Sequence, residues 1–262
     1  MKHYITEHIG HEFIGLTEAL GASALMLKSV VFWFFRSRFE LSETIKQCVK
    51  IGVDSVTVTV LTSFFTGMVL ALQMGHSMRN LFSEPMYIGT MVAFTMLKEL
   101  GPVLTSVVVA GRAGAVVTAE IGTMRVTEQI DALYTLGTNP TRHLLVPRYI
   151  AFMIMLPLLT VLADFLGVAG GCLVGVVKLD ISPAVYFDDI LTYLDIADFM
   201  HGFLKTFFFA FMIATVSCYK GMSTKGGAEG VGKSTTEAVV ASMVLVMVLD
   251  YFISALLVAV GI

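Results

Sequence analysis

Residues 97–147 read LKELGPVLTSVVVAGRAGAVVTAEIGTMRVTEQIDALYTLGTNPTRHLLVP, and this stretch decides the fold. It begins as an apolar helix that carries Lys98 and Glu99, and it ends in a short amphipathic segment, residues 127–136. The chain on either side consists mostly of long hydrophobic runs. A polar, charged connection between two membrane helices must do something other than span the membrane.

The amphipathic segment has apolar residues at three-residue spacing and polar residues on its other faces. That pattern is typical of a helix that lies on the membrane surface or docks into a groove of another protein. An ordinary amphipathic connecting loop fits the periodicity equally well. The apolar residues are Ile130, Leu133 and Leu136, and the polar ones are Glu128, Gln129 and Asp131.

The composition indicates a protein of the lipid bilayer. Its 262 residues are 56% hydrophobic and 14% charged, with a mean hydropathy of +0.82, whereas soluble domains have about 25% charged residues. An alternating run, VTVTV at 56–60, would suit a strand, but an isolated strand leaves its backbone groups unpaired in lipid. The fold class predicted is therefore all-α and polytopic. Three cysteines, Cys48, Cys172 and Cys218, lack the paired spacing of a disulfide set or metal site.

Five runs are long and apolar enough to span, since a spanning helix needs about 20 predominantly apolar residues. Residues 10–35 form a shorter run that Lys28 interrupts, which favours a helix in the cytoplasmic interface, with a sixth span as the alternative. We expect one domain, 1–262, with an N-terminal interfacial region at 1–45 and a transmembrane bundle at 46–262. The predicted spans are 53–76, 87–110, 149–177, 200–219 and 238–260.

Basic residues are distributed unequally between the connections. Eleven Lys and Arg residues fall on one side and two on the other, where the 179–199 loop is acidic. By the positive-inside rule the 111–148 connection is cytoplasmic, the N-terminus is inside and the C-terminus is outside. The larger set is Arg36, Arg38, Lys46, Lys50, Arg112, Arg125, Arg142, Arg148, Lys220, Lys225 and Lys233, and the smaller set is Arg79 and Lys178.

Two glycine patterns have structural interpretations. Gly167, Gly171 and Gly175 form a smooth ridge at four-residue spacing, suited to packing within the subunit or against a second copy. Residues 227–234, GAEGVGKS, match a phosphate-binding loop, but they lie between two predicted spans with no room for a nucleotide-binding domain. We expect a polar loop there, in which one of the hydroxyl residues 234–236 caps the fifth helix.

Ionisable residues within predicted spans are costly and by default suggest function. For Asp164, Lys205 and Asp250 the favoured interpretation is structural pairing between helices. Glu99 differs because Pro102 removes a backbone donor nearby and loosens the helix, and a break beside a charge commonly lines a cavity. The five intramembrane charges are Lys98, Glu99, Asp164, Lys205 and Asp250.

Arg112 lies near the cytoplasmic end of the second predicted span. There it is suited to binding a lipid phosphate, to neutralising Glu120 or to snorkelling toward water. The sequence contains no Ser/His/Asp set, no metal-ligand cluster and no paired-carboxylate site. The residues therefore predict a non-enzymatic protein without a metal or cofactor of its own.

Several separated motifs resemble, in order and spacing, those of the MlaE family, the permeases of ABC-type lipid transporters that work with MCE proteins. The resemblance covers roughly residues 45–262. The motifs are TGMVLALQ at 66–73, ELGP at 99–102, AGRAGA at 110–115, TAEIGTM at 118–124, EQIDAL at 128–133, NP at 139–140, PR at 147–148 and GVGKSTTEAVV at 230–240.

The resemblance implies a homodimeric permease in a bacterial inner membrane that moves phospholipid between the inner and outer membranes. Its implied partners are a cytoplasmic ATPase that binds ATP and Mg²⁺, a periplasmic MCE ring and a small STAS-type subunit, with no nucleic acid. It implies that EQIDAL belongs to the coupling helix. It also places ELGP, namely Glu99, Leu100, Gly101 and Pro102, near the lipid cavity, for which Gln73 and Arg112 are further candidates.

Three alternatives stay open at this point. Relatives of the family handle sterols or other lipids. A stand-alone carrier could couple transport to ions through Glu99, Lys205 and Asp250. A passive scaffold would use the same charges only for structure.

Overall fold

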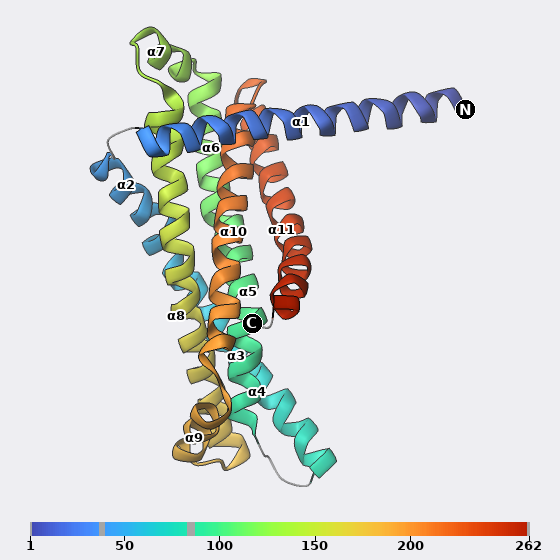
Figure 1. Ribbon diagram of the computed structural model, residues 1–262, viewed down its shortest axis with the longest axis vertical. Coiled ribbons are helices and arrows are strands. Elements are labelled where there is room, and N and C mark those ends of the chain that lie inside the picture. Colours follow the sequence, from blue (N-terminus) through green and yellow to red (C-terminus); the bar gives the residue numbers. More distant parts are fainter. Residues whose placement is uncertain (1, 37–39, 83–86, 261–262) are drawn as a thin grey trace.

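The computed structural model describes the backbone of residues 2–36, 40–82 and 87–260, and the side chains of 17–36, 40–78 and 87–260. In these ranges all regular elements are helices (Figure 1), and six are long and apolar enough to cross a membrane. The expected all-α, polytopic architecture is thereby confirmed. Arg38 and the side chain of Arg79, both used above for orientation, lie outside the described residues.

Five long helical rods form the bundle; π-helical turns join consecutive helices within two of them and begin a third. The first rod is α2 (Leu41–Cys48), η1 (Val49–Val53) and α3 (Asp54–Phe82). The second is α4 (Ile88–Thr95), η2 (Met96–Leu100), α5 (Gly101–Val109), η3 (Ala110–Gly114) and α6 (Ala115–Val126). The others are η4 (Thr141–Leu145) with α8 (Val146–Leu179), α10 (Ile196–Met222) and α11 (Gly227–Val260).

Short helices mark the two ends of the bundle. We call them the α7 end, after α7 (Gln129–Thr135), and the α9 end, after α9 (Pro183–Tyr193). The helix α1 (Lys2–Arg36) lies across the α7 end instead of along the rods (Figure 1), although residues 17–36 have the length and hydropathy of a span. This arrangement agrees with the interfacial interpretation of residues 10–35.

The rods extend further than hydropathy predicted. Residues 88–126 form one continuous helix of 39 residues, so the connection at the α7 end is 127–140 and not 111–148. Hydropathy reports contact with lipid, and a helix continues beyond the membrane wherever its own hydrogen bonds and packing allow.

The phosphate-loop-like string is also helical, so the predicted loop at this position is wrong. α11 begins at Gly227, and the two glycines at its start, Gly226 and Gly227, have positive φ values of 90° and 67°. Farther along, the Thr235 and Thr236 hydroxyls donate to carbonyls four residues back, at 2.7 and 3.1 Å. These side chains therefore satisfy the helix interior and do not cap its start, a common role of threonine within helices.

The tightest packing joins α3 to α8 through small residues. A methyl group on Gly67 would overlap the carbonyl oxygen of Gly167, and one on Gly170 would overlap that of Phe64. Such direct backbone contact requires small side chains at the interface. The glycine ridge of α8 therefore packs within the subunit. Its partner is a buried stripe on η1 and α3 at three- or four-residue spacing, Gly52, Ser55, Thr59, Ser63, Gly67, Ala71 and Gly75.

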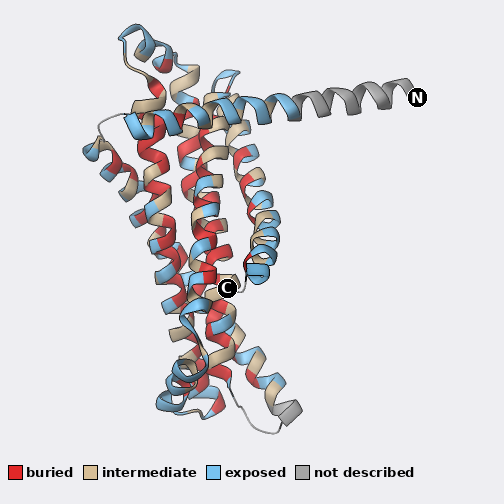
Figure 2. Ribbon diagram, viewed as in Figure 1, coloured by how far each residue is buried: buried red, intermediate tan, exposed pale blue. Residues whose placement is uncertain are grey.

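Burial is concentrated between α3, α5, α8 and α10, whereas α1 and α11 are largely exposed (Figure 2). At the α9 end the core includes Tyr186 of α9, whose side chain is fully buried and donates to the Val168 carbonyl at 3.4 Å. Burial raises the pKa of the Tyr186 hydroxyl, so it remains a neutral donor. The acidic 179–199 connection is thus a packed helical cap and not a free loop.

Candidate functional site

The ELGP motif joins a π-helical turn, Met96–Leu100, to α5: its first two residues end the turn, and Pro102 occupies the first turn of α5. Proline has no N–H, so the carbonyl of Lys98, four residues earlier, lacks its usual helical donor. The Lys205 ammonium of α10 supplies a replacement and donates to this carbonyl at 3.0 Å. The expected loosening at Pro102 is therefore a widened turn that a neighbouring helix satisfies, and the rod stays continuous.

Lys205 also joins two carboxylates from other helices. Its Nζ lies 2.7 Å from Glu99 Oε2 and 3.0 Å from Asp250 Oδ1. The Ser254 hydroxyl lies 3.4 Å from the other Glu99 oxygen. We call Glu99, Lys205, Asp250 and Ser254 the charged cluster. The pairing between helices expected for Lys205 and Asp250 is present.

Exposure differs sharply within the charged cluster. The Lys205 side chain is completely buried, that of Asp250 is 21% exposed and that of Glu99 is 44% exposed. Two carboxylates and one ammonium give a net charge of −1 when all three are ionised. The group presented at the surface of this subunit is therefore an anion, while its cation is enclosed.

Lys98 points to a different partner. Its ammonium lies 2.7 Å from Asp198 Oδ1 and 4.7 Å from the centre of the Phe94 ring. Sequence reasoning assigned Asp198 to the outward loop and missed this pair. The signal was present, because Asp195 and Asp198 form a capping box that starts α10.

Asp164 is buried at 6% exposure against the backbone of Gly101. Among the described residues no opposite charge pairs with it, and its Oδ1 has no hydrogen-bond partner. The interhelical pairing expected for Asp164 is therefore wrong. Its close contact instead explains the need for glycine at position 101.

The other predicted cavity residues divide into two groups. Leu100, Gly101 and Pro102 lie beside the charged cluster, and Gly101 and Pro102 are buried. Gln73 is exposed on α3, close to where Gly75 meets Leu179, and no described contact joins it to the cluster.

Arg112 also lies away from the charged cluster. Its guanidinium donates to the Lys50 carbonyl at 3.1 and 3.3 Å and lies 3.3 Å from Asp54. Glu120 is instead paired with Lys50 at 2.6 Å and Arg148 at 3.1 Å. Of the three roles left open for Arg112, the neutralisation of Glu120 is therefore the one that these contacts contradict.

The predicted coupling residues lie on and around α7. Glu128 precedes the helix in a left-handed conformation with φ 60°, and Asp131 pairs with Arg125 at 2.7 Å. Ile130 is fully buried in its own subunit and Leu133 is partly buried, whereas Leu136 is 78% exposed. Glu128, Gln129 and Asp131 are exposed. The apolar face thus packs mainly on this subunit, and the surface available to a partner is polar with Leu136 at its edge.

Comparison with known proteins identifies relatives along nearly the whole chain. Residues 44–256 match the family model "Permease MlaE". A probable ABC transporter permease protein of Rickettsia felis is 42% identical over 252 residues, covering 96% of this chain and 97% of its own. A Synechocystis protein of similar description, slr1045, is 37% identical, covering 92% and 91%. The intermembrane phospholipid transport system permease protein MlaE of Haemophilus influenzae is 33% identical, covering 97% of both chains.

Proposed function

Because this chain belongs to the MlaE family of ABC transporter permeases, we propose that it moves phospholipids between the inner and outer membranes of a bacterium. A permease of this kind is a non-catalytic membrane subunit, and a separate ATPase hydrolyses ATP. Family membership decides against a stand-alone ion-coupled carrier and against a passive scaffold. The phospholipid substrate is supported by the name of the Haemophilus influenzae relative.

One observation carries the location of the substrate path, namely a half-exposed carboxylate within a span. The Glu99 side chain is 44% exposed beside the enclosed Lys205. A charge at this depth is too costly to face hydrocarbon, and such residues line the bundle interior or a water-filled cavity. A second copy of the chain would provide the opposite wall. We infer that Glu99 faces a lipid cavity between two copies.

The proposed orientation places the α7 end in the cytoplasm. Arg125, Arg142 and Lys225 belong to this end, and the acidic 179–199 connection belongs to the other. Basic connections are retained on the cytoplasmic side. The ATPase and a small STAS-type subunit would then bind at the α7 end of an inner-membrane protein, and a periplasmic MCE ring would bind at the α9 end.

We assign the contact with the ATPase to the segment 128–136. Its exposed polar residues would set the register of docking, since charged groups at an interface govern specificity. Leu136 would supply the apolar contact. Ile130 and Leu133 would hold α7 to the permease. A displacement of segment 128–136 by the ATPase would then be transmitted to α6 and η4.

Reversal of the Glu99 charge tests the cavity. In the assembled transporter, Glu99→Arg should impair ATP-dependent transfer of phospholipid between donor and acceptor vesicles, with insertion and ATPase binding retained. The matched control is Glu18→Arg on α1, where the glutamate is exposed and remote from the charged cluster. Normal transfer by Glu99→Arg would remove Glu99 from the substrate path, and loss of the protein itself would show a structural role.

A further inference from the structure

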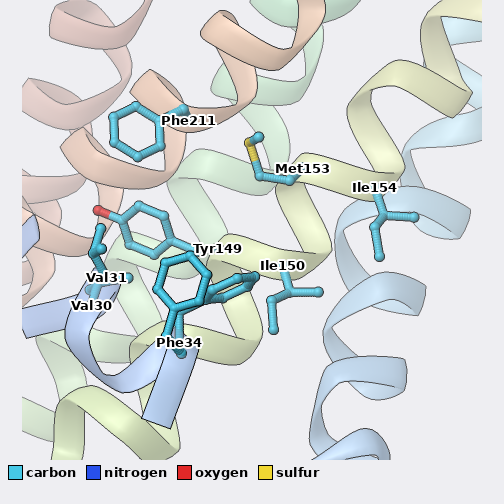
Figure 3. Close-up of a pocket in the computed structure, with 9 residues that line it drawn as sticks. Val30, Val31, Phe34, Tyr149, Ile150, Met153, Ile154 and Phe211 are labelled. Carbon is cyan, nitrogen blue, oxygen red and sulfur yellow. The ribbon is translucent and has the colours of Figure 1, made fainter. Parts of the chain in front are cut away.

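A second apolar site lies between α1 and the bundle, separate from the charged cluster. The cleft has a volume of about 370 Å³ (Figure 3). Val31 and Phe34 of α1 form one wall, Tyr149 and Met153 of α8 form another, and Phe211 of α10 closes it. All three elements meet near the α7 end, where α1 crosses the rods.

The chemistry of the lining selects an alkyl chain. The Tyr149 hydroxyl is the one side-chain hydroxyl among the nine lining residues, and it already donates to Thr215 at 3.1 Å. Every other lining side chain is aliphatic, aromatic or a thioether. A polar ligand would find no partner here, whereas an alkyl chain gains from burial along its length.

The surroundings of the cleft point to the bilayer as the source of that chain. Phe35 of α1 is 83% exposed and Ile154 of α8 is 47% exposed, so the lining continues onto the surface that faces lipid. α1 lies across the bundle (Figure 1), the position of an interfacial helix, and helices of that kind bury their apolar face at the boundary of headgroups and acyl chains.

Cations on α1 complement a phospholipid headgroup. Lys28 is exposed and precedes Val31 by three residues, which places both on neighbouring positions of the helix surface. Arg36 follows the cleft residue Phe35 in the sequence, and its guanidinium lies 5.9 Å from the centre of the Phe32 ring on the same helix. We propose that this cleft binds one acyl chain of a phospholipid from the leaflet at the α7 end, with Lys28 and Arg36 contacting its phosphate.

The bound lipid would serve as an anchor for α1 and not as cargo. Phe211 is six residues from Lys205 on α10, and Lys205 is enclosed whereas Phe211 is 41% exposed. The cleft and the charged cluster thus face different sides of α10. A chain in the cleft fills the space between α1 and α8, so occupancy should hold α1 against the bundle.

Photo-crosslinking in the reconstituted transporter tests the proposal. The probe is phosphatidylglycerol with a diazirine on one acyl chain, in phosphatidylcholine vesicles, and crosslinked peptides are mapped by mass spectrometry. We expect the yield at Phe34 to exceed that at Leu158, a lipid-facing residue of α8 that is 56% exposed. Met153→Trp, which fills the cleft, should lower the Phe34 yield about tenfold, as for a loss of 1.4 kcal/mol in binding.

Control variants separate this site from bulk lipid. Leu158→Trp adds the same side chain outside the cleft and should leave the Phe34 yield unchanged. Val31→Trp fills the cleft from α1 and should repeat the effect of Met153→Trp, which guards against misfolding of either variant. Lys28→Gln with Arg36→Gln should lower labelling by the phospholipid but not by a diacylglycerol probe.

Two results would overturn the proposal. Equal yields at Phe34 and Leu158, both insensitive to Met153→Trp, would mean ordinary contact with bulk lipid. Labelling of the isolated subunit that disappears in the full transporter would mean that a protein partner or a second copy covers the cleft. Neither result depends on phospholipid transfer, so the proposed lipid cavity at Glu99 is tested independently of this cleft.

Discussion

Replacement of Lys205 by methionine should destabilise the bundle, because it leaves carboxylates behind without their cation. Removing one partner of a buried ion pair costs about 3–5 kcal/mol. The Glu99 side chain is 44% exposed, so water compensates most of its loss, whereas Asp250 is 21% exposed and depends more on the ammonium. The Lys98 carbonyl also loses a donor, at about 1 kcal/mol. We expect a total loss of about 3 kcal/mol, near the lower bound for a buried pair.

Thermal unfolding of the detergent-solubilised subunit measures this loss. A destabilisation of about 3 kcal/mol corresponds to a fall in Tm of roughly 10 °C for a protein of this size. The matched control is Lys220→Met on the same helix, because Lys220 pairs with Glu237 at 2.7 Å but both side chains are partly exposed, at 32% and 44%. Such a pair contributes about 0–1 kcal/mol.

The double variant Lys205→Met/Asp250→Asn identifies the cause. It removes the stranded charge together with the ammonium, so it should recover at least half of the stability that Lys205→Met loses. Equal losses for Lys205→Met and Lys220→Met would refute the reasoning. So would a double variant no more stable than the single one, because the cost would then come from packing and not from charge.

Three further predictions concern packing, coupling and orientation. Gly67→Leu should prevent folding because its side chain would overlap the backbone of Gly167, whereas Gly232→Ala, with open space around it, should be neutral in a yield and Tm assay. Leu136→Asp should weaken copurification of the ATPase at unchanged Tm, whereas Ile130→Asp should lower Tm first; the opposite order would contradict our assignment of α7. A reporter fused to the C-terminus should be found outside the cytoplasm, because the proposed orientation places that terminus there. Reporter activity in the cytoplasm would overturn the proposed orientation.

Hydropathy was sufficient to predict the number and approximate position of the rods, because spanning helices must be apolar over a minimum length. It was insufficient for their ends. Residues 111–126 read as a polar connection, yet they continue the second rod as η3 and α6. The pairs of Arg112 and Glu120 with residues of other elements satisfy these polar side chains without ending the helix.

The charged cluster was predicted in its members but not in its geometry. Glu99, Lys205 and Asp250 lie on three rods whose rotation and register no periodicity reports. The hydrogen bond from Lys205 to the Lys98 carbonyl was not predicted either. Pro102 does indicate that this carbonyl lacks a helical donor, because proline has no N–H and lies four residues later. For Ile130 the amphipathic pattern correctly predicted an apolar face. It did not indicate whether that face packs on this subunit or docks into a partner protein.

The small-residue stripe of α3 was readable and was overlooked. Glycine, alanine, serine and threonine recur there at three- or four-residue spacing for most of the span, which is the pattern of close helix contact. The bulky residues between them, such as Phe65 and Leu72, are exposed on the surface of the bundle and dominate a hydropathy average. Periodicity of residue size would have identified the α3–α8 interface.

That interface has a mechanical consequence for a transport cycle. Backbones that touch through Gly67, Gly167 and Gly170 have no rotamers to rearrange, so sliding would force atoms into overlap. We expect α3 and α8 to move as one stiff strut. We expect α11 to be the wall that moves relative to them, because its spanning window is only 11% buried, although it packs on its neighbours through Ala238, Ser242 and Val246 and pairs with Lys205 through Asp250. A movement of α7 driven by the ATPase would then shift α3 and α8 together relative to α11, and the Lys205–Asp250 pair would hold α11 to α10.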